Sequence, residues 1–167
     1  MLQKQHNILS NIVIGSMSTK FENSLFYQIN LSSKCFNMLF EQFFKELNLG
    51  ISATEHLALA IIIETQNCCQ RDLAKIILKD RANTGKLAGL LEQKGLIKIE
   101  ATIKNNRAVK ILTPTKKGVD LNNKIMEIIN PLLKKIKNEI SEKIVEETKT
   151  ALKNIREVVQ KNVKINI

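Results

Sequence analysis

The spacing of apolar residues predicts a helical chain interrupted by one short β-hairpin. Apolar positions recur every three to four residues, as in amphipathic helices, in four segments: 22–48, 53–65, 70–78 and 81–94. From Ile97 the period changes to two, because Ile97, Ile99 and Ala101 alternate with charged side chains. Val109 and Ile111 repeat this alternation beyond a polar tip. The sequence therefore predicts a hairpin after the fourth helix.

Local signals place the ends of the helices. Ser52 and Glu55 have capping-box spacing before the second helix, and Asp80 is suited to cap the fourth. Gly95 follows that helix as a C-terminal stop. Two pairs, Thr113-Pro114 and Asn130-Pro131, are expected to open the last helices. The third helix is expected to bury Ile76 and the fourth Leu90.

The order of these elements is typical of a winged helix-turn-helix. We therefore predict a mainly α fold with a small β-hairpin wing, in which helical regions flank the winged helix-turn-helix. The expected parts are an N-terminal appendage (1–20), a first helix (21–50), the winged helix-turn-helix (51–113) and C-terminal helices (114–167).

The last helix, expected over about 132–162, carries a long apolar stripe. One small winged unit cannot cover a stripe of that length, so a second copy of the chain is the expected partner. The residues expected at the dimer seam are Leu133, Ile136, Ile140, Ile144, Leu152, Ile155 and Val159.

Charge is concentrated in the middle of the chain. The net charge is +10, and residues 70–118 contain 12 basic and 4 acidic side chains. This concentration of basic residues favours a polyanionic partner. A lysine-rich solvated surface would give the same excess of basic over acidic residues. All seven aromatic residues lie outside the segment. Because single-strand and RNA binders need aromatic stacking platforms, duplex DNA is the expected partner.

Several side chains are expected to contact that DNA. Arg81, Asn83 and Lys86 lie on the polar side of the fourth helix, where they can reach base edges. Arg107 at the hairpin tip can enter an adjacent narrow minor groove. The remaining candidates, most of them for phosphate contacts, are Arg71, Lys75, Thr84, Lys104 and Asn106.

Three stretches resemble the MarR family of bacterial transcriptional regulators: Cys69–Ala74, Leu90–Ile97, and Arg107–Thr113 followed by Gly118. The resemblance implies a homodimer with two winged units on a palindromic operator. In it, a helical dimerisation region is formed by the first helix (21–50) and the C-terminal helices (114–167), and residues 51–113 are the winged helix-turn-helix DNA-binding domain. It also implies repression that is relieved by a small phenolic or lipophilic ligand, or by cysteine oxidation.

The sequence departs from the family pattern at three places. Asn105 stands where the family has an aspartate that orients the wing arginine, so that salt bridge is lost. Gly85 and Gly89 each cost the fourth helix about 1 kcal/mol relative to Ala. These glycines either allow the helix backbone to approach DNA closely or only destabilise the helix. Cys69 occupies a helix-cap position that is usually Ser or Thr.

The three cysteines are the candidate redox sensors. Cys68 and Cys69 lie at the start of a helix, where a thiol pKa is lowered. Cys35 lies on the phenylalanine-rich first helix, which either lines a ligand cavity or only packs. For each cysteine, the simpler alternative is a buried small hydrophobe.

Other classes of function lack support in the sequence. His6 and His56 have no metal-ligand spacing, so neither a metal nor a cofactor is expected. No nucleophile, acid and base form a catalytic set, which argues against an enzyme. No apolar run is long enough for a membrane helix, so a cytoplasmic protein is expected. The alternative to a sequence-specific regulator is a helical protein-interaction module without sequence-specific DNA binding.

Overall fold

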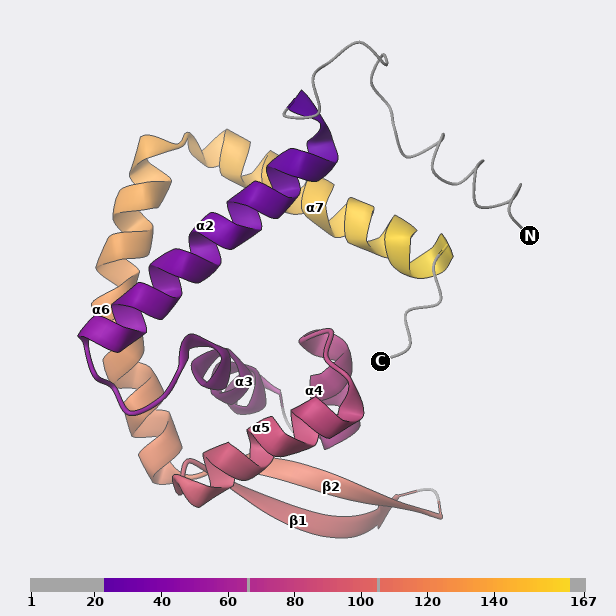
Figure 1. Ribbon diagram of the computed structural model, residues 1–167. Helices are drawn as coiled ribbons and strands as arrows, with labels where there is room; N and C mark the ends of the chain where they lie inside the picture. Colours follow the sequence, from indigo (N-terminus) through magenta and orange to yellow (C-terminus); the bar gives the residue numbers. More distant parts are fainter. Residues whose placement is uncertain (1–22, 66, 105, 163–167) are drawn as a thin grey trace. The chain divides into compact units, whose positions relative to one another are not determined.

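The computed structural model describes residues 23–65, 67–104 and 106–162, and confirms the predicted fold class. Figure 1 shows helices and one two-stranded hairpin. The elements are α2 (Leu25–Glu46), α3 (Ala53–Glu64), α4 (Gln70–Ile76), α5 (Arg81–Gln93), β1 (Ile97–Lys104), β2 (Arg107–Pro114), α6 (Lys116–Glu139) and α7 (Glu142–Asn162). No described helix is long and apolar enough to cross a membrane.

The chain divides into two compact units at Asn48. In the first unit, the Ser24 side chain caps α2 by accepting a hydrogen bond from the Tyr27 amide at 3.2 Å. The rings of Phe43 and Phe44 meet edge to face, with centroids 6.1 Å apart. The helix ends at Glu46, and Asn48 just beyond the C-cap Leu47 has a left-handed φ of 46° that turns the chain away.

The second unit begins at Leu49 and has one apolar core. Its fully buried large apolar side chains come from α3, α4, α5, the turn before β1, both strands and α6: Leu59, Ile62, Leu73, Leu91, Leu96, Ile97, Leu112 and Ile125. The predicted capping box of α3 is confirmed. The Ser52 amide donates to Glu55 Oε2 at 2.6 Å, and the Glu55 amide donates to Ser52 Oγ at 3.2 Å.

The α4–α5 pair forms the helix-turn-helix. Leu78 in the connecting turn has a φ of 52°, and Asp80 caps α5 as predicted by accepting from the Asn83 amide at 2.9 Å. Two predictions of burial were wrong. Ile76 is 52% exposed and Leu90 is 46% exposed, because each lies at the edge of its helix's apolar face rather than at its centre.

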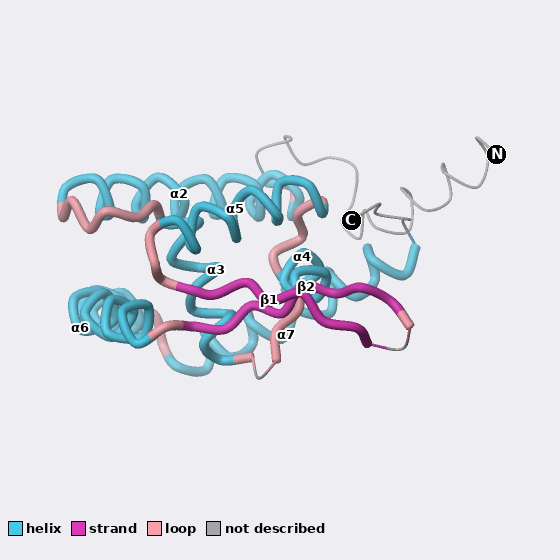
Figure 2. Tube along the Cα trace, turned by 90° about the horizontal axis from the view of Figure 1, so that it is seen from below, coloured by secondary structure: helices cyan, strands magenta, loops and turns pink. Residues whose placement is uncertain are grey.

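The hairpin is longer and tighter than its sequence indicates. Pairing runs from Ile97 opposite Pro114 to Lys104 opposite Arg107, so the expected polar tip at 102–107 shrinks to a two-residue loop. Figure 2 shows the strands side by side along their length. The base of β2 is tied to the segment before α4, because the Leu112 amide donates to the Cys68 carbonyl at 2.8 Å.

The start of α6 differs from the prediction. Its N-cap is Thr115, not Thr113, and Pro114 closes β2 instead of opening the helix. The Thr115 hydroxyl accepts from the Gly118 amide at 3.1 Å and donates to the Gly95 carbonyl at 2.7 Å. This hydroxyl therefore joins the end of α5 to the start of α6, which is why the cap lies two residues later than expected.

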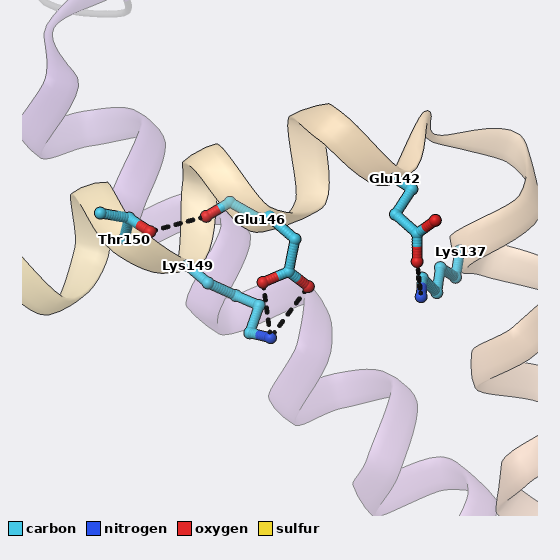
Figure 3. Close-up of polar contacts among 5 residues, drawn as sticks. All are labelled: Lys137, Glu142, Glu146, Lys149 and Thr150. Carbon is cyan, nitrogen blue, oxygen red and sulfur yellow. Dashed lines mark hydrogen bonds and ion pairs between the residues drawn. The ribbon is translucent and has the colours of Figure 1, made fainter.

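The C-terminal helices also divide at an unexpected place. Asn130-Pro131 does not open a helix, because Pro131 lies inside α6. The break falls at Ile140, whose backbone is extended, and Ser141 then caps α7 by accepting from the Ile144 amide at 3.4 Å. Figure 3 shows Lys137 and Glu142 paired across this corner at 2.8 Å. The predicted single helix over 132–162 is therefore two helices.

Candidate DNA-binding surface

A side-chain hydrogen bond links α4 to α5 in the helix-turn-helix. Gln70 Nε2 at the start of α4 donates to the Arg81 carbonyl at 3.2 Å. Gly85 makes room for this amide, because a Cβ at that position would lie 2.9 Å from Gln70 Nε2. A larger residue at position 85 would displace this amide, which is the end of a flexible side chain. The side chains of Arg71 and Lys75 on α4 are exposed, as expected.

The first turns of α5 present cations to solvent. Arg81, Asn83 and Lys86 are all exposed. Asn83 is also held in place, because its Nδ2 donates to Asp80 Oδ2 at 2.6 Å. Hydrogen bonds from Asn83, first from its backbone amide and then from its side chain, lower the pKa of Asp80 below its ordinary value. The Asp80 carboxylate thus fixes the orientation of one candidate base-reading residue.

Thr84 does not face outward as expected. Its side chain is fully buried, and its hydroxyl donates to the Asp80 carbonyl at 2.8 Å. Thr84 lies between the core positions Leu87 and Ala88 on the helical wheel, so its position in the helix and not its polar side chain decides its burial. It is a structural residue of α5 and cannot contact a phosphate in this conformation.

The wing adds a second cationic site to the same unit. Arg107 and Asn106 are exposed at the hairpin tip, and Asn106 has a left-handed φ of 55°. Figure 1 shows the hairpin running beneath α5, with its tip toward the end at which α5 begins. Exposed Lys98 and Lys110 extend the charge along the strands; their alternation with apolar residues was the signal that could have identified them. Asn105 and the Lys104 side chain lie outside the described residues.

An ion pair supports the other end of α5. Lys94 Nζ lies 2.6 Å from Glu55 Oε1, with the Glu55 side chain only 8% exposed. Burial alone would raise the pKa of Glu55, but hydrogen bonds from Lys94 and Ser52 outweigh it and hold the pKa below its ordinary value. This pair anchors the C-terminal end of α5 to the start of α3.

A buried histidine joins α3 to α6. His56 Nε2 lies 3.0 Å from Asn122 Oδ1, and burial lowers the pKa of His56 below its ordinary value despite this hydrogen bond. His56 is therefore a buried histidine with a side-chain partner. The described residues contain no cluster of His, Cys, Asp and Glu that could hold a metal ion.

The cysteine pair behaves differently from the prediction. Cys68 is 1% exposed, and burial raises the pKa of its thiol to about 11, so the expected lowering was wrong for this residue. Cys69 is half-buried at the N-cap of α4, and its Sγ lies 2.9 Å from Asp72 Oδ2. All three cysteines are free, and Cys35 is exposed.

The expected dimer seam leaves its apolar side chains uncovered within one chain. Leu133, Ile140, Ile144 and Leu152 are between 37% and 54% exposed. Ile136, Ile155 and Val159 are half-buried, and α7 contains no buried residue at all.

Comparison with known proteins identifies the fold. A MarR protein from Peptoclostridium difficile is 20% identical, with a TM-score of 0.71 over 88% of this chain and 95% of its own. The chain has the fold of the MarR regulators. S. aureus MepR, solved in a DNA complex, is 17% identical with a TM-score of 0.68 over 85% of this chain and 99% of its own.

A third MarR-like structure is that of CouR from Rhodococcus jostii RHA1, bound to p-coumaroyl-CoA. It is 16% identical, with a TM-score of 0.70 over 83% of this chain and 95% of its own. No family model matches the sequence, and no curated protein matches it. The MarR-like fold confirms the winged helix-turn-helix that the order of the elements predicted.

Proposed function

We propose that this chain is a transcriptional regulator of the MarR type that binds duplex DNA as a homodimer in the cytoplasm. The observation that carries the proposal is the placement of exposed Arg81 and Lys86 on α5 and exposed Arg107 on the wing of one compact unit. In this arrangement α5 enters the major groove and the wing tip contacts the adjacent minor groove. Arg71 and Lys75 bind phosphates and set the register.

The homodimer follows from the exposed seam on α6 and α7. Buried apolar area between two such stripes would hold two winged units at a fixed separation, as a palindromic operator requires. In this proposal residues 51–113 form the DNA-binding domain, and residues 21–50 and 114–167 form the dimer. Residues 1–20 lie outside the described residues.

The regulator is proposed to be a repressor that an effector releases. Among the similar structures, CouR binds an aromatic acyl-CoA, which supports a small lipophilic or phenolic effector here. Oxidation of Cys69 is the second proposed route, because this half-buried thiol lies at the start of α4 and its neighbour Cys68 is hydrogen-bonded to β2.

Salt dependence of DNA binding tests the proposal. Duplex fragments would first be selected from the source genome, and their affinity measured by fluorescence anisotropy over a range of salt concentrations. A dimer that uses about 8 phosphate contacts should give a log–log slope near −7. The absence of duplex binding at moderate salt would contradict the proposal. It would favour a helical protein-interaction module, for which the exposed faces of α6 and α7 are the supporting observation.

A further inference from the structure

The outer half of the wing carries a large apolar side chain, Ile103, that the winged unit does not cover. Residues directly opposite each other in an antiparallel pair point to the same side of the sheet. Ile97 and Ile103 therefore share a face, with Leu112, Lys110 and Ala108 on the other strand. At the base of the wing this face belongs to the core, where Ile97 and Leu112 are each 1% exposed. At the tip, Ile103 is 78% exposed, the highest value among the large apolar side chains of the described chain.

A cation occupies the opposite face of the same tip. Arg107 pairs with Lys104, one position beyond the Ile103–Ala108 pair, so its side chain points to the other side of the hairpin. The wing tip thus has an apolar side chain on one face and an exposed guanidinium on the other. A hairpin that lay flat on a phosphate backbone with its Arg107 face would leave Ile103, on the other face, in water.

The charge of the wing restricts what can cover Ile103. Lys98, Lys110 and Arg107 are exposed on this hairpin against a single exposed acid, Glu100. A second copy of the same basic wing would be repelled at this site, whereas a polyanion would be attracted. The occupant must therefore combine negative charge with apolar surface. The minor groove of duplex DNA does so, because phosphates border it and deoxyribose carbons form its walls.

We propose that the wing tip enters the minor groove with both faces in contact, so that Ile103 packs against the deoxyribose of one wall while Arg107 occupies the groove. This inference rests on the proposed DNA-binding function and adds an apolar contact to it. Proteins that bind the minor groove combine arginine with inserted apolar side chains, isoleucine among them. Because deoxyribose is common to all sequences, Ile103 contributes affinity and sensitivity to groove width rather than base identity.

The test compares three variants of the full chain on one selected duplex: Ile103→Ser, the matched Ile103→Leu, and Arg107→Ala. Ile103→Ser is expected to weaken binding about five- to tenfold per wing, the loss of a partly buried isoleucine, with an unchanged salt slope. Ile103→Leu is expected to bind as the wild type does. Arg107→Ala is expected to lower both the affinity and the slope, because it removes a cation.

Hydroxyl-radical footprinting supplies a second readout, because these radicals attack the deoxyribose hydrogens that line the minor groove. The wild type should protect sugars beside the sites that α5 covers, and Ile103→Ser should lose this flanking protection while it keeps the central one. Urea unfolding should show equal stability for the wild type and Ile103→Ser, because Ile103 is already exposed to water.

Two outcomes would overturn the inference while the regulator stands. One is an Ile103→Ser protein with the affinity and footprint of the wild type. The other is an Ile103→Ser protein that binds DNA normally but self-associates less in sedimentation, which would make this face an interface between copies. A wild type that shows no salt-dependent duplex binding would instead overturn the proposed function itself.

Discussion

Gly118 in the first turn of α6 lies directly against the carbonyl oxygen of Leu96, where β1 is about to begin. A Cβ at position 118 would fall far inside van der Waals contact with that backbone oxygen, and 3.3 Å from Leu59 Cδ1. The Leu96 oxygen also accepts a hydrogen bond from the Thr115 amide at 3.0 Å, so it is not free to move away. The family resemblance includes this glycine, and the structure supplies the physical reason for it.

Gly118→Ala is therefore expected to destabilise the protein by about 1–3 kcal/mol or more, the cost of overpacking a rigid contact. Gly89→Ala is the matched control, since a Cβ there meets nothing within 4 Å, and it should stabilise the protein by about 1 kcal/mol through helix propensity. Urea unfolding of the two variants measures both effects. Equal stability would show that α6 shifts freely relative to β1.

The Glu55–Lys94 pair predicts a pH-dependent contribution to stability. Its hydrogen bonds hold the pKa of Glu55 below the value of 4.5 for an unperturbed carboxyl. The stabilisation is therefore fully present above about pH 4.5 and is lost as the pH falls through the folded-state pKa. Glu55→Gln should cost about 1–3 kcal/mol at pH 7, and the difference from wild type should shrink toward pH 3.

Unfolding of both proteins in urea across this pH range measures the effect. Glu142→Gln is the control, because it removes the exposed Lys137–Glu142 pair and should change stability far less. If the difference between wild type and Glu55→Gln stayed constant from pH 7 to pH 3, the ion pair would not be its source.

Two neighbours on α5 are expected to respond oppositely to substitution. Lys86→Ala should leave the free energy of unfolding almost unchanged and make the salt slope of DNA binding less steep by about 1 per subunit. Thr84→Val should cost about 1 kcal/mol of stability, because it removes the buried hydroxyl and its hydrogen bond to the Asp80 carbonyl. It should keep the wild-type salt slope. Anisotropy titrations at several salt concentrations, paired with urea unfolding, separate the two. A reduced salt slope for Thr84→Val would indicate that Thr84 contacts DNA after all.

Charged substitutions on α7 test whether its apolar seam forms the dimer interface. Ile144→Glu combined with Ile155→Glu would place carboxylates in the proposed dimer interface, where burial without a partner is costly. The double variant is expected to run as a monomer in light scattering and to lose operator affinity. Thr150→Ala should remain dimeric, because Thr150 is exposed and helical periodicity places it away from Ile144 and Ile155 on α7. A dimeric double variant would locate the interface elsewhere.

The vicinal cysteines should differ in reactivity. Cys68 is buried with a thiol pKa of about 11, whereas Cys69 is half-buried beside Asp72. At pH 7.5, a short exposure to a maleimide should label Cys69 and leave Cys68 intact, as measured by peptide mass spectrometry. Faster labelling of Cys68 would mean that the α4–β2 junction opens in solution.

Much of the winged unit could be predicted from the sequence because its signals are local. The Ser52–Glu55 box, the Asp80 cap and the alternation from Ile97 each depend on residues a few positions apart. Predictions failed where a distant partner decides the outcome. Thr115 caps α6 because its hydroxyl also reaches Gly95, and Thr84 is buried because the core closes over that side of α5.

The prediction of where the C-terminal helices begin and end failed for a related reason. A proline after asparagine is a common helix start, but Pro131 removes only one backbone donor, and α6 continues through it. The signal that was missed is Ser141-Glu142, a cap followed by an acidic first-turn residue. For the DNA-binding surface, residue type identified the exposed cations Arg71, Lys75, Arg81, Lys86 and Arg107. Residue type alone could not show that Asn83 is anchored by Asp80.

The bond between the Leu112 amide and the Cys68 carbonyl has a mechanical consequence. The residues before α4 therefore pair with β2 as an isolated bridge between Cys69 and Ile111, and the hairpin can move away from α4 only if this hydrogen bond breaks. A change that displaces the backbone of Cys68 would also have to break this hydrogen bond and would shift the β1–β2 hairpin. Oxidation of a cysteine at the start of α4 would therefore alter the position of the wing within the same winged unit, without any change at the dimer interface.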